Sequence, residues 1–267
     1  MLSVVKPCGS IRALDLLAAQ EPVSTHRDRA RTRSKMRTGV CVIALLALLP
    51  AIAAVPARAQ DQDLNRDVNG TSVGSGGGGT WNLSDPVWSL SSDGVSGPYR
   101  VWDNLALDNA IFGGTAGTIS LTAPITVHDI TFNTNGYVLT GNTLTLAGVD
   151  PTISVTTGSA TISSAVTGTG GLIKAGAGTL TMSGNNSFVG GLTVNAGTLS
   201  LIGNNSFGSS PAITGGALSL TGTNSFVGDI SVNGTLTASG AAALGAAGNN
   251  ITISGGSLDI GATGGTL

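Results

Sequence analysis

The sequence predicts an all-β solenoid, in which short strands stack coil upon coil, and two observations carry this prediction. The first is an internal repeat: three similar segments start at Gly178, Gly197 and Gly216, each 19 residues after the last. The second is that apolar residues alternate with small polar ones over residues 111–267, in the two-residue period of β-strands. A constant period of 19–20 residues, rich in β-formers and turn residues, is typical of a solenoid.

The repeat also predicts which side chains form the stacked core. One unit is too small to bury its own apolar side, so equivalent residues of neighbouring coils must cover each other. The predicted core residues are Leu180, Met182, Phe188, Leu199, Leu201, Phe207, Leu218, Leu220 and Phe226. The column Asn186, Asn205 and Asn224 is expected to form a ladder of side-chain amides along the axis. Residues 111–267 are long enough for roughly eight coils.

Residues 80–110 differ from the repeats because they hold four of the ten aromatic residues of the chain, Trp81, Trp88, Tyr99 and Trp102. Large rings at the start of an aliphatic body indicate an N-terminal cap that covers the strand edges of the first coil. A sugar-stacking platform is the alternative interpretation. Residues 60–79 are polar and then glycine-rich, so we expect a flexible leader before the cap.

Residues 36–59 have the pattern of a secretory signal. Basic residues precede the apolar stretch 40–55, and the small-x-small tripeptide Ala57-Arg58-Ala59 follows it. We therefore expect export through the Sec translocon and cleavage by signal peptidase between Ala59 and Gln60. An uncleaved membrane anchor is the alternative, but the apolar stretch is short for a membrane span and Pro50 interrupts it.

The first residues of the chain leave two interpretations open. Residues 1–59 contain nine of the twelve basic residues, and they are either a signal with an extended n-region or a signal whose true start is Met36. Both cysteines, Cys8 and Cys41, also precede residue 60. A chain that starts at Gln60 therefore has neither a disulfide nor a thiolate metal site.

The charge of the exported part excludes a nucleic-acid partner. From Gln60 to Leu267 there are three basic and eleven acidic residues, which gives a formal charge of −8. Three cations cannot neutralise a run of phosphates. Binding to anionic lipid is disfavoured for the same reason.

No constellation in the exported part is typical of catalysis. His128 lies beside Asp129 in an apparent strand, where neighbours point to opposite faces, so we expect an exposed strand histidine. The stretch from Gly171 to Lys174 lacks the spacing of a phosphate-binding loop. Beyond Thr152 the ionisable side chains are Lys174, Asp229 and Asp259. A secreted carbohydrate-active β-helix enzyme needs several acids and bases in one groove, so it stays the alternative, and we predict no catalytic residue.

The stretch from Asp61 to Gly70 is the best candidate for a metal site. Its alternating carboxylates and amides resemble the start of a calcium loop. A loop that starts at Asp61 has Arg66 at the position that needs glycine, and a loop that starts at Asn65 has Gly76 at the position that needs glutamate. We therefore expect a solvated segment and predict no metal site and no cofactor.

The segment from Gly178 to Leu199 resembles the autotransporter-associated β-strand repeat, in its Gly-Thr-Leu-Thr-Met-Ser-Gly-Asn-Asn-Ser-Phe stretch and in the Val-Asn-Ala-Gly-Thr-Leu that closes it. The stretch from Ala110 to Leu146 is similar to the start of an autotransporter passenger. The resemblance covers about residues 81–267. It implies a right-handed parallel β-helix that is exported to the periplasm and displayed across the outer membrane by type V secretion.

The resemblance also implies an outer-membrane β-barrel translocator as partner. Members of the family end in such a barrel, whereas no run of alternating barrel strands precedes Leu267. We expect either a passenger truncated before its barrel or a two-partner-secreted adhesin with a separate translocator. The predicted function is a structural or interaction role at the bacterial cell surface, including adhesion, with a periplasmic location if no translocator is available. No residue identifies the adhesive target.

Overall fold

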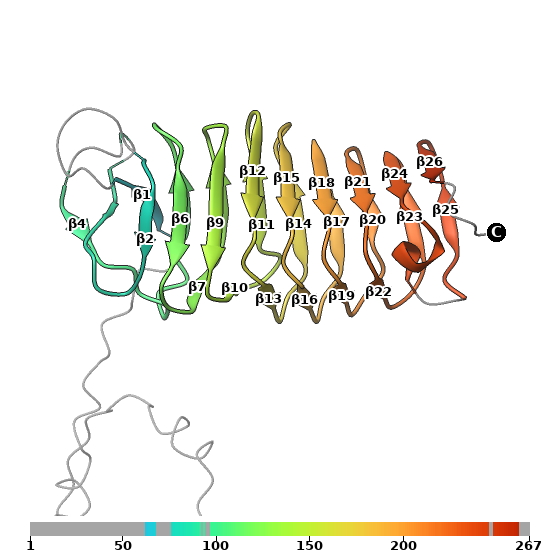
Figure 1. Ribbon diagram of the computed structural model, residues 1–267, viewed down its shortest axis with the longest axis horizontal. Helices are drawn as coiled ribbons and strands as arrows, with labels where there is room; N and C mark the ends of the chain where they lie inside the picture. Colours follow the sequence, from blue (N-terminus) through green and yellow to red (C-terminus); the bar gives the residue numbers. More distant parts are fainter. Residues whose placement is uncertain (1–61, 68–75, 92, 94–96, 246–247, 262–267) are drawn as a thin grey trace, which may run out of the picture. The chain divides into compact units, whose positions relative to one another are not determined.

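The computed structural model describes residues 62–67, 76–91, 93, 97–245 and 248–261. These residues form an all-β solenoid whose strands lie side by side along one axis (Figure 1). The predicted fold class is therefore confirmed. The preceding unit of the chain, residues 1–55, lies outside the described residues, and so do the predicted cleavage positions Ala57, Ala59 and Gln60.

Three sheets form the sides of the solenoid, with eleven strands in sheet 1, nine in sheet 2 and six in sheet 3. In spatial order, sheet 1 contains β4 (Tyr99–Arg100), β3 (Trp88–Ser89), β1 (Asp63–Arg66), β5 (Asn109–Phe112), β8 (Ile130–Phe132), β11 (Thr152–Val155), β14 (Leu172–Ala175), β17 (Leu192–Val194), β20 (Ala212–Ile213), β23 (Ile230–Val232) and β25 (Ile251–Ile253). Sheet 2 contains β2 (Gly79–Trp81), β6 (Thr118–Leu121), β9 (Tyr137–Gly141), β12 (Ser159–Ile162), β15 (Thr179–Met182), β18 (Thr198–Leu201), β21 (Ala217–Leu220), β24 (Thr235–Ala238) and β26 (Ser257–Ile260). Sheet 3 contains β7 (Ile125–Val127), β10 (Leu144–Leu146), β13 (Val166–Gly168), β16 (Ser187–Phe188), β19 (Asn205–Phe207) and β22 (Asn224–Phe226).

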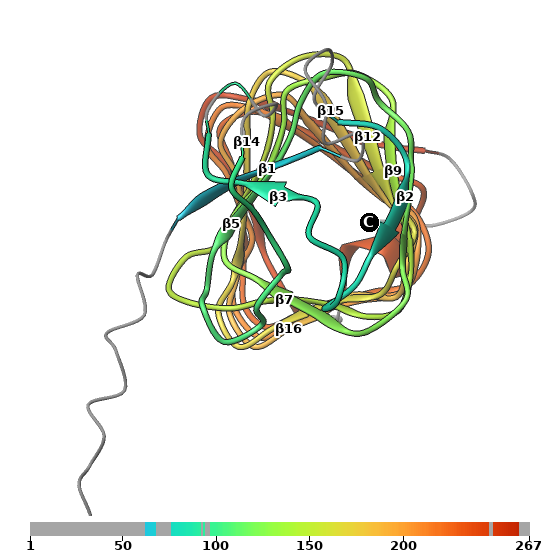
Figure 2. The same ribbon diagram turned by 90° about the vertical axis from the view of Figure 1, so that its left-hand side faces the viewer.

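Each coil takes one strand from sheet 1, then one from sheet 2, then one from sheet 3. Coil 1 comprises β5, β6 and β7, and coils 2 to 6 continue in the same way to β22. Coil 7 comprises β23, β24 and the 3-10 helix η2 (Ala241–Leu244), and coil 8 has β25 and β26. Seen from the N-terminal end, the path runs clockwise as it recedes, so the solenoid is right-handed (Figure 2).

Equivalent residues of successive coils stack in register. The strands of the coils pair in parallel, and antiparallel pairing occurs between β1 and β3 and between β3 and β4. The repeat columns that pair are Leu180–Leu199–Leu218 and Met182–Leu201–Leu220 in sheet 2, and Phe188–Phe207–Phe226 in sheet 3. The phenylalanine rings stack with centroids 5.1 and 5.5 Å apart, so each ring covers the face of the next.

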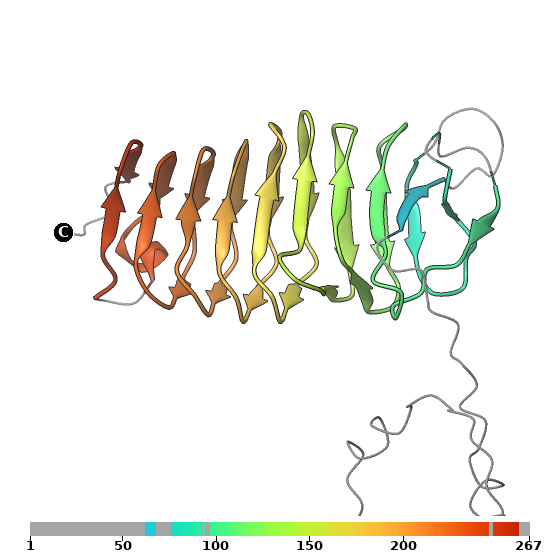
Figure 3. The same cartoon turned by 180° about the vertical axis from the view of Figure 1, so that it is seen from behind.

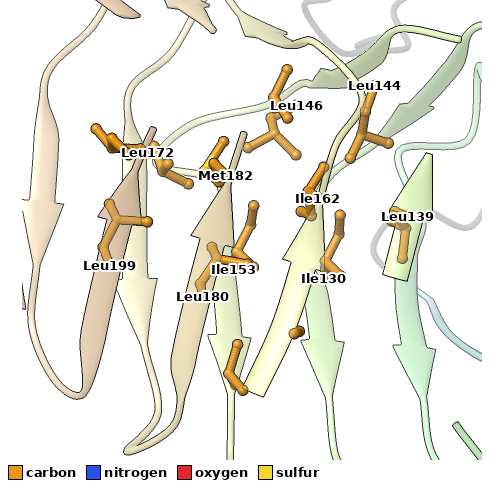
Figure 4. Close-up of a cluster of buried hydrophobic side chains, with 14 of the residues drawn as sticks. Ile130, Leu139, Leu144, Leu146, Ile153, Ile162, Leu172, Leu180, Met182 and Leu199 are labelled. Atoms are coloured by element: carbon orange, nitrogen blue, oxygen red, sulfur yellow. The ribbon is translucent and has the colours of Figure 1, made fainter. Parts of the chain in front are cut away.

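The core runs along the inside of the three sheets because each strand buries every second residue. β15 and β18, for example, bury their second and fourth residues and expose the others in part. Aliphatic side chains from all three sheets meet in the interior, among them Ile130, Ile162 and Leu146 (Figure 4). Full burial of one such side chain contributes roughly 1.5–3 kcal/mol, and because each coil buries only a few, neighbouring coils must stack to be stable.

The corner between sheets 1 and 2 carries a column of glycines that lie too close for any side chain. A Cβ on Gly197 would lie 2.3 Å from the carbonyl oxygen of Gly178, and a Cβ on Gly234 would lie 2.1 Å from that of Gly216. Gly197 also has a φ of 63°, which favours glycine. The repeated glycine therefore sets how closely successive corners approach each other.

Part of the predicted leader is built into the solenoid, so the expectation of a flexible segment is wrong for β1. This strand pairs in parallel with β5, and the side chain of Leu64 is fully buried. The polar composition is misleading because Leu64 and Arg66 alternate with Asp63 and Asn65, so that only the first pair faces the interior. Residues 68–75 lie outside the described residues.

Three tryptophans gather at the N-terminal end of the core, where β1 and β3 cross the end of the solenoid (Figure 2). Trp81, Trp88 and Trp102 are fully buried, with ring centroids 4.8–4.9 Å apart. Trp81 and Trp88 also lie 5.5 and 5.7 Å from Phe112 of coil 1. The rings thus cover the first coil with apolar surface.

At the other end, η2 takes the place of a seventh strand in sheet 3 (Figure 3). Its Ala243 is buried, and the carbonyl oxygen of Ala243 accepts the side-chain amide of Asn224 at 3.0 Å. Sheet 3 therefore ends at β22, while sheets 1 and 2 continue with β25 and β26.

Candidate functional site

The described residues with distinctive chemistry are polar side chains inside the solenoid. The buried polar residues are Arg66, Asp67, Ser89, Asp108, Ser164, Lys174, Asn186, Asn205 and Asn224. A buried polar group is costly unless it is hydrogen-bonded, so the partners of these residues decide whether they stabilise or weaken the coils.

The three buried asparagines form a continuous ladder along sheet 3. Asn186 donates its side-chain amide to the Asn205 side-chain oxygen at 2.7 Å, and Asn205 donates to that of Asn224 at 2.7 Å. Asn205 also donates to the carbonyl oxygen of Gly203 at 2.7 Å. The predicted amide ladder is thus present, and it joins coils 4, 5 and 6 through the interior.

Lys174 is the one lysine of residues 60–267, and its side chain is fully buried. Its ammonium donates to the carbonyl oxygens of Ala175 at 2.5 Å, of Gly176 at 2.9 Å and of Ala196 at 3.2 Å. Three donors thus meet three acceptors, two in coil 4 and one in coil 5. Burial lowers the pKa of Lys174 to about 8.

Arg66 has a similar position at the N-terminal end. Its guanidinium donates to the carbonyl oxygen of Thr80 at 2.9 Å and faces the ring of Trp88 at 5.7 Å from the ring centroid. Burial lowers the pKa of Arg66 to about 10. The guanidinium therefore joins β1 to β2 with hydrogen bonds and a ring contact.

At the corner between sheets 1 and 2, long polar side chains donate hydrogen bonds to backbone carbonyl oxygens. Arg66 approaches it before coil 1, where the carbonyl oxygen of Gly78 lies 3.5 Å from the guanidinium, and Lys174 reaches it in coils 4 and 5. The single proton of the Tyr137 hydroxyl is shared between the carbonyl oxygens of Gly113 and Thr115, which lie 2.6 and 2.8 Å away. Burial raises the pKa of the Tyr137 phenol. Backbone carbonyls that point inward at this corner are thus satisfied by side chains from inside the solenoid.

The structure corrects the prediction of a strand histidine. β7 ends at Val127 and β8 begins at Ile130, so His128 and Asp129 form the corner between sheets 3 and 1, and His128 is partly buried. The carboxylate of Asp129 accepts the backbone N–H of Thr152 at 2.7 Å, so its role is to hold the next coil. A corner of only two residues leaves the alternating patterns on both sides intact, so the periodicity does not reveal it.

The calcium-like stretch forms hydrogen bonds within the protein instead. Asp63 accepts from the Asn109 amide at 2.9 Å, and Asp67 accepts the Tyr99 hydroxyl at 2.7 Å. Among the described residues, no three histidine, cysteine, aspartate or glutamate side chains are grouped so as to hold a metal ion. Asp61 lies outside that part of the chain.

The ionisable side chains beyond Thr152 do not come together. Lys174 is buried between coils 4 and 5, Asp229 accepts the backbone N–H of Asn250 at 2.9 Å at the corner before β23, and Asp259 lies in β26. The structural roles of Arg66 and Lys174 are not among the features that the sequence predicts. Each of them lies two residues after a buried leucine in the same strand. Because side chains two residues apart in a strand point to the same face, this position indicates that Arg66 and Lys174 point into the solenoid.

In the part of the chain that the structure describes, no helix has the length and apolar character needed to cross a membrane. The predicted signal segment falls outside that part.

Comparison with known proteins gives two findings. Residues 172–201 and 215–238 match the passenger-associated-transport-repeat family. The chain is also similar to the protein named "Adhesin BmaC autotransporter" of Brucella suis biovar 1 (strain 1330), with 53% identity over 149 residues. This match covers 56% of the chain but only 4% of the relative. No solved structure matches the chain.

These findings confirm the predicted resemblance to an autotransporter passenger with β-strand repeats. The matched residues 172–201 run from β14 to β18 and residues 215–238 include β21 to β24. The family repeats therefore cover most of coils 4 to 7, without β19 and β20.

Proposed function

We propose that this chain is part of an autotransporter passenger that is displayed at the bacterial cell surface and contributes to adhesion. The observation that carries the proposal is the position of the passenger-associated repeats, which supply the stacked strands β14 to β18 and β21 to β24. The relative that is named an adhesin autotransporter adds support for the adhesive role. The proposed partners are the Sec translocon, signal peptidase and an outer-membrane β-barrel translocator.

The physical character of the solenoid suits this route. Residues 60–267 contain no cysteine, so no disulfide has to form or break while the chain passes through a pore. Each coil contacts its neighbours and few distant residues, so folding can proceed coil by coil after transport. A rod of stacked coils also extends away from its attachment point, as a surface-exposed scaffold requires.

A secreted carbohydrate-active enzyme remains the second candidate, and the arrangement of charges disfavours it. Glycoside cleavage needs two carboxyl groups that flank one bond. In coils 4 to 8, Asp229 lies at a corner between sheets 3 and 1, whereas Asp259 belongs to sheet 2. Two carboxylates on different sides of the solenoid do not face one substrate.

The location is tested with antibodies against the folded solenoid on cells that produce the protein from its own gene. We expect intact cells to be labelled, and protease added outside to remove the signal. Labelling that requires permeabilisation of the outer membrane would place the chain in the periplasm and overturn the display proposal. Solenoid found in the medium, without a covalently attached barrel, would support the two-partner-secreted adhesin in its place.

Adhesion is tested by comparing these cells with cells that carry an in-frame deletion of residues 111–260. Attachment to host cells or to matrix-coated surfaces should fall in the deletion strain. The control is a strain with Ser206→Ala, an exposed residue of β19, which should adhere normally. Equal attachment of all three strains, when the wild-type and Ser206→Ala cells carry the passenger at their surface, would remove the adhesive role.

A further inference from the structure

Lys174 lies in an unusual place for a charged residue, because its strand position is an inward one. In the register of sheet 1, it pairs with Ile153 of β11 on one side and with Val194 of β17 on the other. The side chains of both neighbours and of Lys174 itself are fully buried. A cation thus occupies a position that the other repeats fill with an aliphatic side chain.

No ionisable group in the surrounding coils offers a counter-charge. Between Pro151 and Gly228 the sequence contains no aspartate, glutamate, arginine, histidine, tyrosine or cysteine, and Lys174 is its one charged residue. The inward side chains of the packed strands β11, β15 and β17 are aliphatic or, at Met182, a thioether. The ammonium is therefore held by carbonyl dipoles alone, from Ala175, Gly176 and Ala196.

An ammonium held in this way weakens the fold when it is protonated. Burying a charge without a charged partner costs several kcal/mol, whereas a neutral amine costs much less. The pKa of Lys174 falls from 10.5 to about 8 because of burial, while the unfolded chain keeps the ordinary value. Between these two pH values the unfolded chain binds more protons than the folded one, so the free energy of unfolding rises with pH.

We propose that Lys174 is a protonation switch in the middle of the solenoid: its ammonium weakens the contact between coils 4 and 5, and loss of the proton tightens it. The position matters because a solenoid is stable only through contacts between neighbouring coils. A weak contact in the middle allows the two halves to open locally while each stays folded. The inference does not depend on the proposed adhesive role.

The test is urea unfolding of the full chain from pH 7 to pH 9.5, followed by far-ultraviolet circular dichroism. The range stops at pH 9.5 so that it stays below the pKa of Arg66, which burial lowers to about 10. In the wild type, the unfolding equilibrium constant should fall by about tenfold or more across this range. Lys174→Met has a similar shape without charge, so it should be more resistant to urea at pH 7 and show no such change.

Lys174→Arg keeps its charge over the whole range and should remain as sensitive to urea at pH 9.5 as at pH 7. A wild-type midpoint that is constant or falls with pH overturns the proposal. An equal rise in wild type and Lys174→Met also overturns it, because the rise would then come from another group.

A second measurement locates the effect. Trypsin can cut after Lys174 only when coils 4 and 5 open, since the side chain is fully buried in the folded state. The rate of this cleavage, divided by the rate for an unstructured lysine peptide, should decrease from pH 7 to pH 9.5. An increase, or no change while the global urea midpoint rises, would show that protonation acts elsewhere.

Discussion

The amide ladder inside sheet 3 can be tested at Asn205, its central residue. Asn205 accepts the amide of Asn186 and donates to Asn224 and to the carbonyl oxygen of Gly203, each at 2.7 Å. Asn205→Ala removes these three hydrogen bonds, of which the two to asparagines are buried and the one to Gly203 is partly buried, and the Asn205 side chain is only 3% exposed. The Asn224 side-chain oxygen and the Gly203 carbonyl then lose a buried donor.

The expected cost follows from the groups that lose a partner. An unsatisfied buried polar group costs about 1–3 kcal/mol, and Asn186 keeps one of its two amide contacts, to Gly184 at 2.9 Å. Two orphaned acceptors and a small cavity therefore predict a loss of about 3–5 kcal/mol. The matched control is Asn204→Ala, the adjacent exposed residue, whose side chain accepts the N–H of Thr223 at 3.1 Å. We expect its loss to stay below about 1 kcal/mol.

Two spectroscopic signals distinguish unfolding of the N-terminal end of the solenoid from unfolding of all its strands. Circular dichroism reports all strands, whereas fluorescence reports the N-terminal end, since the three tryptophans of the chain lie there. Asn205→Ala should shift the dichroism midpoint in urea, and the fluorescence midpoint should shift less if the coils unfold in separate units. A loss for Asn205→Ala within about 0.5 kcal/mol of that for Asn204→Ala would refute the claim that the ladder stabilises the coils.

Three further changes test the stacking and the corners. Leu199→Asp places an unpaired charge between two stacked leucines and should cost several kcal/mol in urea unfolding; unchanged unfolding would contradict the register. Gly197→Ala should lower the free energy of unfolding by about 2 kcal/mol or more, because its Cβ would lie 2.3 Å from a carbonyl oxygen. The control, Gly261→Ala, has 3.6 Å to the nearest atom and should leave thermal unfolding nearly unchanged. Tyr137→Phe removes the one hydroxyl proton that two inward carbonyls share, so its melting temperature should drop by an amount that corresponds to about 1–3 kcal/mol. An unchanged melting temperature would mean that water replaces the hydroxyl.

The repeat made the fold of residues 178–226 predictable. Leucine, asparagine and phenylalanine recur at one spacing, and identical residues can stack at that spacing only if the strands are parallel and in register. The resemblance to autotransporter repeats added the right-handed path. The amide ladder followed from the same columns, because asparagines in register bring donor and acceptor together.

The sequence was less informative wherever the pattern does not repeat. The polar composition of residues 60–79 predicts a flexible leader, but pairing with β5 and an inward-facing leucine make β1 part of the solenoid. The alternating pattern predicts a strand at His128, whereas the structure has a corner between β7 and β8 there. A change of direction after one or two residues leaves both alternating patterns intact, so the periodicity alone cannot reveal it.

By itself, the sequence determined the parallel register, the stacked apolar columns and the low charge of coils 3 to 6, because these depend on residue type and spacing. Only the tertiary structure decided which carbonyls point into the solenoid at the corner between sheets 1 and 2. Arg66 and Tyr137 reach corner carbonyls that are 12 to 24 residues away in the sequence. Lys174 reaches one carbonyl that is 22 residues away, in coil 5, and two where its own strand ends and the corner begins. Their partners depend on how the coils stack in space, and no local pattern in the chain encodes that arrangement.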